Sequence, residues 1–190
     1  VFKRSFSVLV VALLVHKDRQ APFLSRDLFD RAMESVFLYL QKEKDIRGYV
    51  NGKGWAHSIA HGADALDEII RHPSFRIKML DRCLESIQVC LLKEGIYSDD
   101  EDERLLMAVE GLLTRGLADY DLANWVKQLD DKLSCSFDEE GFSVAFSHTK
   151  QNVLTFLKSG YFRVKFNHDA KETMAAIEDV LEKWMKKFYG

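Results

Sequence analysis

The segment Asp45–Asp64, with the sequence DIRGYVNGKGWAHSIAHGAD, gathers the residue types in this chain that could do chemistry. His57 and His61 are four residues apart, so a helix carries both imidazoles on one face. Asp64 follows within one further turn, and two imidazoles with a carboxylate form a set of metal ligands. Ser58, however, stands where the zincin motif requires glutamate. The spacing therefore favours a hydrogen-bonded histidine–aspartate network over a metal centre.

The polar residues of this segment have three interpretations. In the leading one, they line a groove that binds a protein or a peptide and catalyses nothing. In the second, a metal-assisted hydrolase uses His57, His61 and Asp64 as its ligands. In the third, the motif is structural: it locks the glycine-rich loop onto the helix, and Arg47 or Arg104 pairs with the network. The groove candidates are Arg47, Lys53, His57, His61, Asp64, Glu101 and Arg104.

The helix that carries the two histidines is expected to run from Gly54 to about Arg71. Its apolar residues fall on the face opposite the histidines, and they are Trp55, Ile59, Ala63, Leu66 and Ile70. We therefore expect Trp55 in the core and the polar stripe facing away from it. Gly62 lies in the middle of this helix, at a cost of about 0.5–1 kcal/mol relative to alanine. That cost predicts that another helix crosses closely at Gly62.

Apolar residues recur at helical spacing along the whole chain, and only residues 161–166 could form a short strand. Pro22 and Pro73 lie where helices should stop. Ser25 is the expected N-cap of the second helix, and Asp99 or Asp100 that of the fifth. The expected helices cover about 2–17, 25–44, 54–71, 75–91, 101–115, 119–133, 143–158 and 169–188, with a polar break at 134–141. Paired antiparallel helices of this length predict one all-α domain over residues 1–190, built of stacked helical hairpins as in HEAT-like α-solenoids.

Composition narrows the class of protein further. Lysine and arginine number 27 against 30 aspartates and glutamates, a net charge of −3 that indicates neither nucleic acid nor an anionic membrane as a partner. Hydrophobic residues make up 47% of the chain, as in ordinary globular proteins. No dinucleotide fingerprint occurs, and we expect no cofactor. Cys83, Cys90 and Cys135 form no paired motif, which is typical of reduced cysteines in a cytoplasmic protein.

The N-terminal residues contain an apolar run, 8–15, that is too short to span a bilayer. No small-residue cleavage site follows the run, so we interpret it as a buried helix and not as a signal peptide. The chain lacks an initiator methionine and opens directly into this helix, which predicts a fragment of a longer protein. The apolar face of residues 6–15 would then be partly uncovered, and a homodimer is possible.

The chain resembles the bacterial family catalogued as domain of unknown function 2785. The resemblance rests on the central motif RGYV followed by GKGWAH and AHGAD, together with RSFS at residues 4–7 and EDER at residues 101–104. It covers roughly residues 4–130 and is weaker in the last third. What it implies is a helical fold and a longer N-terminus, without an assigned activity or any functional residue to carry over.

Overall fold

The computed structural model describes residues 1–190 as eight α-helices, one 3₁₀ turn and one small hairpin of two strands. The helices are α1 (Phe2–Gln20), α2 (Arg26–Lys42), α3 (Ser58–Arg71), α4 (Leu80–Leu91), α5 (Glu101–Thr114), α6 (Asp119–Glu140), α7 (Val144–Asn167) and α8 (Lys171–Tyr189). The strands β1 (Tyr49–Val50) and β2 (Gly54–Trp55) pair antiparallel, and the 3₁₀ turn covers Ile77–Met79. The prediction of an all-α fold with about eight helices is confirmed.

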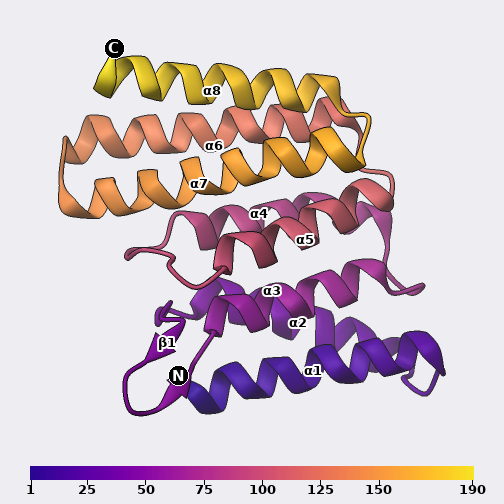
Figure 1. The fold of residues 1–190 in the computed structure, drawn as a ribbon. Coiled ribbons are helices and arrows are strands. Elements are labelled where there is room, and N and C mark those ends of the chain that lie inside the picture. Colours follow the sequence, from indigo (N-terminus) through magenta and orange to yellow (C-terminus); the bar gives the residue numbers. More distant parts are fainter.

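Alternate helices pack on one another along the stack (Figure 1). α3 packs on α1 and on α5, and α5 packs in turn on α7. On the other side α2 packs on α4, and α6 packs on α8. One continuous hydrophobic core runs from α1 to α8 between these helices. The hairpin lies at one end of α3, beside the N-terminus (Figure 1).

The ends of several helices test the sequence analysis. The hydroxyl of Ser25 accepts a hydrogen bond from the backbone N–H of Leu28 at 3.2 Å, which confirms the predicted N-cap of α2. At α5 the N-cap position is Asp100, but its side chain caps nothing. Instead, the carboxylate of Glu101 reaches back and accepts the N–H groups of Ser98 and Asp99. Glu101 therefore fixes the loop before α5, and the predicted side-chain cap on the first turn of this helix is absent.

Two predicted interruptions of the C-terminal helices are wrong. α6 continues through the expected polar break to Glu140, because Leu133 and Phe137 keep the helical spacing that packs it on the core. Residues 161–166 belong to α7 and not to a strand, because Gly160 and Val164 extend its buried face by one further turn. Polarity at 134–141 and β-branched or aromatic residues at 161–166 were weaker signals than this periodicity.

α3 is the most enclosed helix of the stack. Ile59, Leu66, Ile69 and Ile70 are completely buried, so most of the predicted apolar face is confirmed. The helix begins at Ser58 and not at Gly54, because Gly54 and Trp55 form β2. Its polar stripe was predicted to face away from the core. Instead, the stripe faces the helices α1 and α5, which pack on either side of α3.

The outer side of α1 is uncovered, as predicted. Phe6, Val10, Leu13 and Leu14 are each about half exposed and follow one another at helical spacing. Self-association through this face stays a prediction. None of the helices combines the length and the apolarity that crossing a membrane requires.

Gly62 gives the first testable prediction. A Cβ added there would lie 2.5 Å from Cδ2 of the fully buried Leu40 and 3.0 Å from the ring of Tyr39 on α2. We expect Gly62→Ala to lose about 1–3 kcal/mol through overpacking, which outweighs its gain in helix propensity. Gly160→Ala is the matched control, because its Cβ would meet only Cδ2 of Leu106, at 3.0 Å. Urea denaturation measures both, and a Gly62→Ala variant as stable as wild type would contradict the close approach of α2.

Candidate functional site

The candidate site begins at the hairpin that leads into α3. The carbonyl of Gly48 accepts the N–H of Ala56 at 2.7 Å and that of His57 at 3.3 Å, which closes the loop behind the two strands. His57 then takes a left-handed conformation, with φ 44° and ψ 44°, at the N-cap of α3. A left-handed residue other than glycine costs of order 1–3 kcal/mol and persists only where its surroundings hold it. The contacts around His57 must therefore hold this conformation.

Buried polar contacts from three elements hold this loop. Ser5 on α1 is completely buried, and its hydroxyl donates to the carbonyl of Ala56. The hydroxyl of Tyr39 on α2 donates to the carbonyl of Ser58 at 2.9 Å, and the hydroxyl of Ser58 donates to the carbonyl of Asp45. Each contact joins residues that are far apart in sequence, so the loop takes its shape only in the folded stack.

Two further contacts fix the start of the loop and its side toward α5. Arg4 binds Glu43 through both oxygens of the carboxylate, at 2.7 and 2.8 Å, and Glu43 also accepts the backbone N–H groups of Lys44 and Asp45. These hydrogen bonds hold the pKa of Glu43 below its usual value, although burial alone would raise it. The N–H of Tyr49 donates to the carboxylate of Asp99 at 3.2 Å.

Ser5 fixes the tautomer of His61, and burial keeps the imidazole neutral. Because the Ser5 hydroxyl donates to Ala56, its oxygen accepts the proton on Nδ1 of His61, at 2.8 Å, which assigns this tautomer from the hydrogen-bond partners. Burial lowers the pKa of His61 from its usual 6.5, although the nearby Asp64 carboxylate acts in the opposite direction. The imidazole is therefore neutral at pH 7. The buried Ser5 hydroxyl is a positioning group and not an accessible nucleophile.

Five aromatic and imidazole rings from α1, the loop and the start of α3 form a series that we call the ring ladder. Its members are Phe6, Tyr49, Trp55, His57 and His61. Trp55 stacks on His57, with 4.5 Å between the ring centroids and 5° between the planes. Tyr49 meets the Trp55 ring edge-on at 5.0 Å, and Phe6 meets His61 edge-on at 5.4 Å. His57 and His61 join the two pairs at 5.8 Å.

Three of the five rings in the ring ladder are each about half exposed to solvent. Tyr49 and Trp55 are each 50% exposed, and Phe6 is 48% exposed. The prediction that Trp55 packs in the core is therefore wrong. Its aromatic bulk suggested a core position, but hairpin pairing with Tyr49 turns the side chain outward. The dipeptide Asn51–Gly52, a common hairpin turn, is the sequence signal that would have shown this.

Behind the ring ladder lies a buried polar pair without a hydrogen bond. Nδ1 of His57 and Oε1 of Glu101 are 4.0 Å apart, which is too long for a hydrogen bond, and neither atom has another partner. The Glu101 side chain is 1% exposed, and burial raises its pKa. Glu101, a groove candidate, thus lies next to His57 but beneath the surface.

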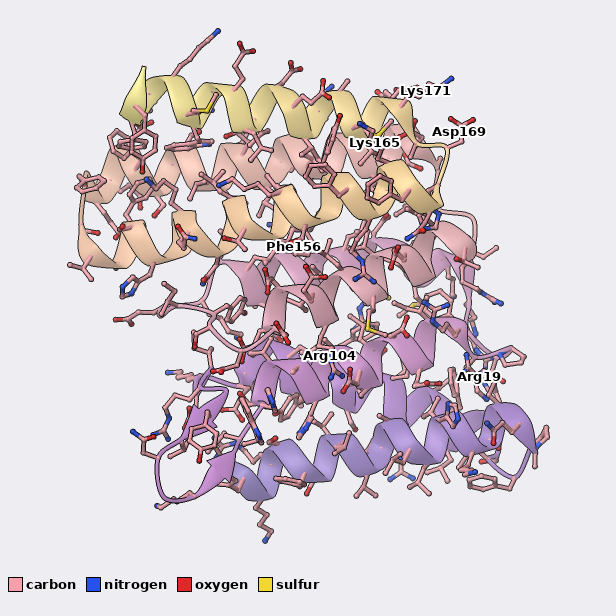
Figure 2. The ribbon with its side chains drawn as sticks, in the orientation of Figure 1. Arg19, Arg104, Phe156, Lys165, Asp169 and Lys171 are labelled. Carbon is pink, nitrogen blue, oxygen red and sulfur yellow. The ribbon has the colours of Figure 1, made fainter.

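The other predicted site residues divide into two groups. Arg104 extends from α5 toward α3 (Figure 2). Its guanidinium pairs there with Asp64 at 2.7 Å, and both charges act on His61, so this part of the predicted network is present. Arg47 instead pairs with Asp45 of its own loop, at 2.6 Å, and does not reach the histidines. Lys53 is exposed at the turn of the hairpin.

The metal-assisted alternative finds no third ligand in this arrangement. The Nδ1–H of His61 donates to Ser5, which leaves only Nε2 as a nitrogen that could bind a metal. Both carboxylate oxygens of Asp64 accept hydrogen bonds from Arg104 and are not free. No three histidine, cysteine, aspartate or glutamate side chains in the structure are placed to hold a metal ion. The residues that the sequence analysis did not single out, Ser5, Tyr39 and Glu43, are those that lock the loop. For Ser5 alone a signal existed, because it lies within the RSFS motif.

Trp55 yields a prediction about stability. Since its side chain is half exposed, Trp55→Ala should cost only about 1 kcal/mol, the value of its lost ring contacts. Trp125→Ala is the control, because Trp125 is 5% exposed and its loss should cost about 3–5 kcal/mol. Urea denaturation measures the free energy of unfolding of both variants. Equal losses of stability would show that Trp55 packs in the core and contradict its exposed position.

His61 yields a prediction about pH. His61→Ala should lose about 1–3 kcal/mol at pH 7.5, because its hydrogen bond to the buried Ser5 disappears. The folded state lowers the pKa of His61, so the unfolded chain binds the proton more readily. The advantage of wild type over the variant is therefore complete above the usual pKa of 6.5 and shrinks as the pH falls through it.

The measurement is urea denaturation of wild type and variant at several pH values, with His148→Ala on α7 as the control. A difference in stability that grows toward low pH would contradict a neutral His61.

Comparison with known proteins identifies the family of the chain. No curated protein and no solved structure matches the chain. The model of the family described as "Protein of unknown function (DUF2785)" matches residues 1–162, which include the loop, α3 and the whole ring ladder. The match extends through most of α7 and thus beyond the part of the chain that carries the recognisable motifs. The chain belongs to the DUF2785 family.

Proposed function

We propose that this protein is a non-enzymatic helical-repeat scaffold, an α-solenoid, that binds a protein or peptide segment on the ring ladder. One observation carries the proposal. The half-exposed Trp55 is held in a fixed orientation by a left-handed His57 and by the hairpin, although an exposed tryptophan contributes little to the stability of the fold. Backbone strain that serves an exposed aromatic side chain favours a role in binding.

The chemistry of the surface supports a protein or peptide as the ligand. Tryptophan, tyrosine and arginine dominate the binding energy of protein interfaces, and here Trp55 and Tyr49 lie side by side. The Asp64–Arg104 pair supplies a polar border next to His61. Because the loop is fixed before binding, little conformational entropy is lost when a partner docks. Lys53 adds an exposed cation at the turn of the hairpin.

The same chemistry does not favour an enzyme. Covalent or metal-assisted hydrolysis would need an accessible nucleophile or a set of metal ligands, and Ser5 is buried while Asp64 is engaged by Arg104. The imidazole of His61 lacks a carboxylate on Nδ1 that would make it a stronger base, since Ser5 occupies that atom.

We further place the protein in the cytoplasm of a bacterial cell. Cys83 and Cys90 are buried free thiols, and burial raises the pKa of both to about 12, so they resist oxidation. The net charge of −3 favours partners other than nucleic acid. The uncovered apolar face of α1 offers a second surface, where a copy of the same chain could pack.

Selection from a displayed library of random peptides tests the binding proposal. Wild-type protein is the target, and the Tyr49→Ala/Trp55→Ala double variant is the counter-target. We expect enriched peptides with a shared motif that bind wild type and bind the double variant at least about tenfold more weakly. Phe162→Ala on α7, far from the ring ladder, should bind them as wild type does. Peptides that bind wild type and the double variant equally would contradict the proposal.

A further inference from the structure

A second, separate groove lies between the two C-terminal helices. These helices are at the far end of the stack from the hairpin (Figure 1). The groove has a volume of about 600 Å³ and lies between α7 and α8. Its lining is mainly apolar and includes Leu154 and Phe162 of α7 and Leu181 and Met185 of α8. Volume and lining are those of a site for a small amphiphilic molecule.

Lys150 marks one end of this groove. The residue is only 7% exposed, and its ammonium lies 4.1 Å from the ring centroid of Phe188 and 5.7 Å from those of Phe142 and Tyr189. No carboxylate pairs with it, and no protein acceptor hydrogen-bonds to it. The ammonium thus has ring contacts but no acceptor from the protein, and it is still open to solvent, where a ligand can reach it. An anion in the groove would supply the missing partner.

The other charged groups at the groove form no ion pair with Lys150. Glu178 accepts a hydrogen bond from the hydroxyl of Tyr161 at 2.6 Å, and Glu182 pairs with Lys186 at 2.6 Å. Both glutamates at the groove thus have partners. Lys158, on the same side as Lys150, has none. The Tyr161 hydroxyl is neutral, so Glu178 keeps its negative charge. The two lysines of the groove lie on α7 and its two glutamates on α8, so the positive side of the groove is α7.

The dimensions select a narrow ligand. From Lys150 to Tyr161 the groove follows α7 for eleven residues, or about 16 Å at the rise of an α-helix. An unbranched chain fits the apolar length between α7 and α8.

We propose that the groove between α7 and α8 binds an unbranched, medium-chain carboxylate, with the carboxylate at Lys150 and the alkyl chain along Leu154, Leu181 and Met185. The charge of Lys150 sets the sign of the head group, and the apolar lining sets the tail. α8 lies beyond the part of the chain that the family model matches, so this site is assigned to this chain and not to its family.

Isothermal titration calorimetry with dodecanoate, below its micelle concentration, tests the site on the full chain. We expect one dodecanoate per chain, and dodecyltrimethylammonium, which has the same tail and the opposite charge, should bind at least about tenfold more weakly. Lys150→Met should weaken dodecanoate about tenfold or more and leave the cationic amphiphile unchanged or stronger. Met185→Glu, at a position that is 60% exposed and tolerates the change, should weaken dodecanoate independently.

Two control variants should bind dodecanoate as wild type does. Lys132→Met removes an exposed lysine of α6, and Leu13→Glu breaks the apolar face of α1, where an amphiphile could otherwise adsorb. Equal affinity for the two amphiphiles, or Lys150→Met and Met185→Glu variants that bind like wild type, would overturn the proposal. So would a dimer that Met185→Glu dissociates and that shows no saturable binding of dodecanoate, because the groove would then take a second copy.

Discussion

The burial of the first turn of α3 is the constraint on which the structure of the site depends. α3 lies between α1 and α5 and is covered by α2, so the backbone groups at its N-terminus have no access to bulk water. Buried N–H and C=O groups must find partners inside the protein. Gly48, Ser5 and Tyr39 provide them, and they come from the loop and from the first two helices. Satisfying these groups is what joins the hairpin to the stack.

The shape of the exposed surface follows from that requirement. With Ala56 bonded to both Gly48 and Ser5, the chain enters α3 only through the left-handed conformation of His57. That conformation sets the imidazole parallel to Trp55 and above the buried Glu101. Polar contacts inside the fold thus fix the orientation of aromatic rings outside it. A surface that is arranged in this way loses little entropy on binding, which connects the fold to the proposed function.

Much of the fold was predictable from the sequence because its signals are local and periodic. Apolar spacing identifies every helix, and Ser25 caps α2 as expected, since a cap depends on neighbours within three residues. The errors at 134–141 and 161–166 arose where local polarity or β propensity opposed a helical period that tertiary packing then favoured.

The candidate site was predictable only in part, since its contacts are long-range. His61, Asp64 and Arg104 were identified as a group, because spacing on α3 and charge on α5 indicate them. Ser5 lies fifty-one residues from Ala56, and no local pattern relates the two. Arg47 is the opposite case, because it was expected to join the histidines but pairs with Asp45, only two residues away. Trp55 was misplaced because helical periodicity alone assigns every large apolar residue to the core, whereas binding surfaces expose some of them.

The central claim is that the loop and the ring ladder are fixed before any partner binds, and backbone ¹⁵N relaxation of the free protein tests it most directly. The account predicts order parameters for residues 48–57 close to those of α3, about 0.85. Values below about 0.6 across Tyr49, Trp55 and His57 would describe a loop that moves on the nanosecond timescale. They would contradict a preformed surface.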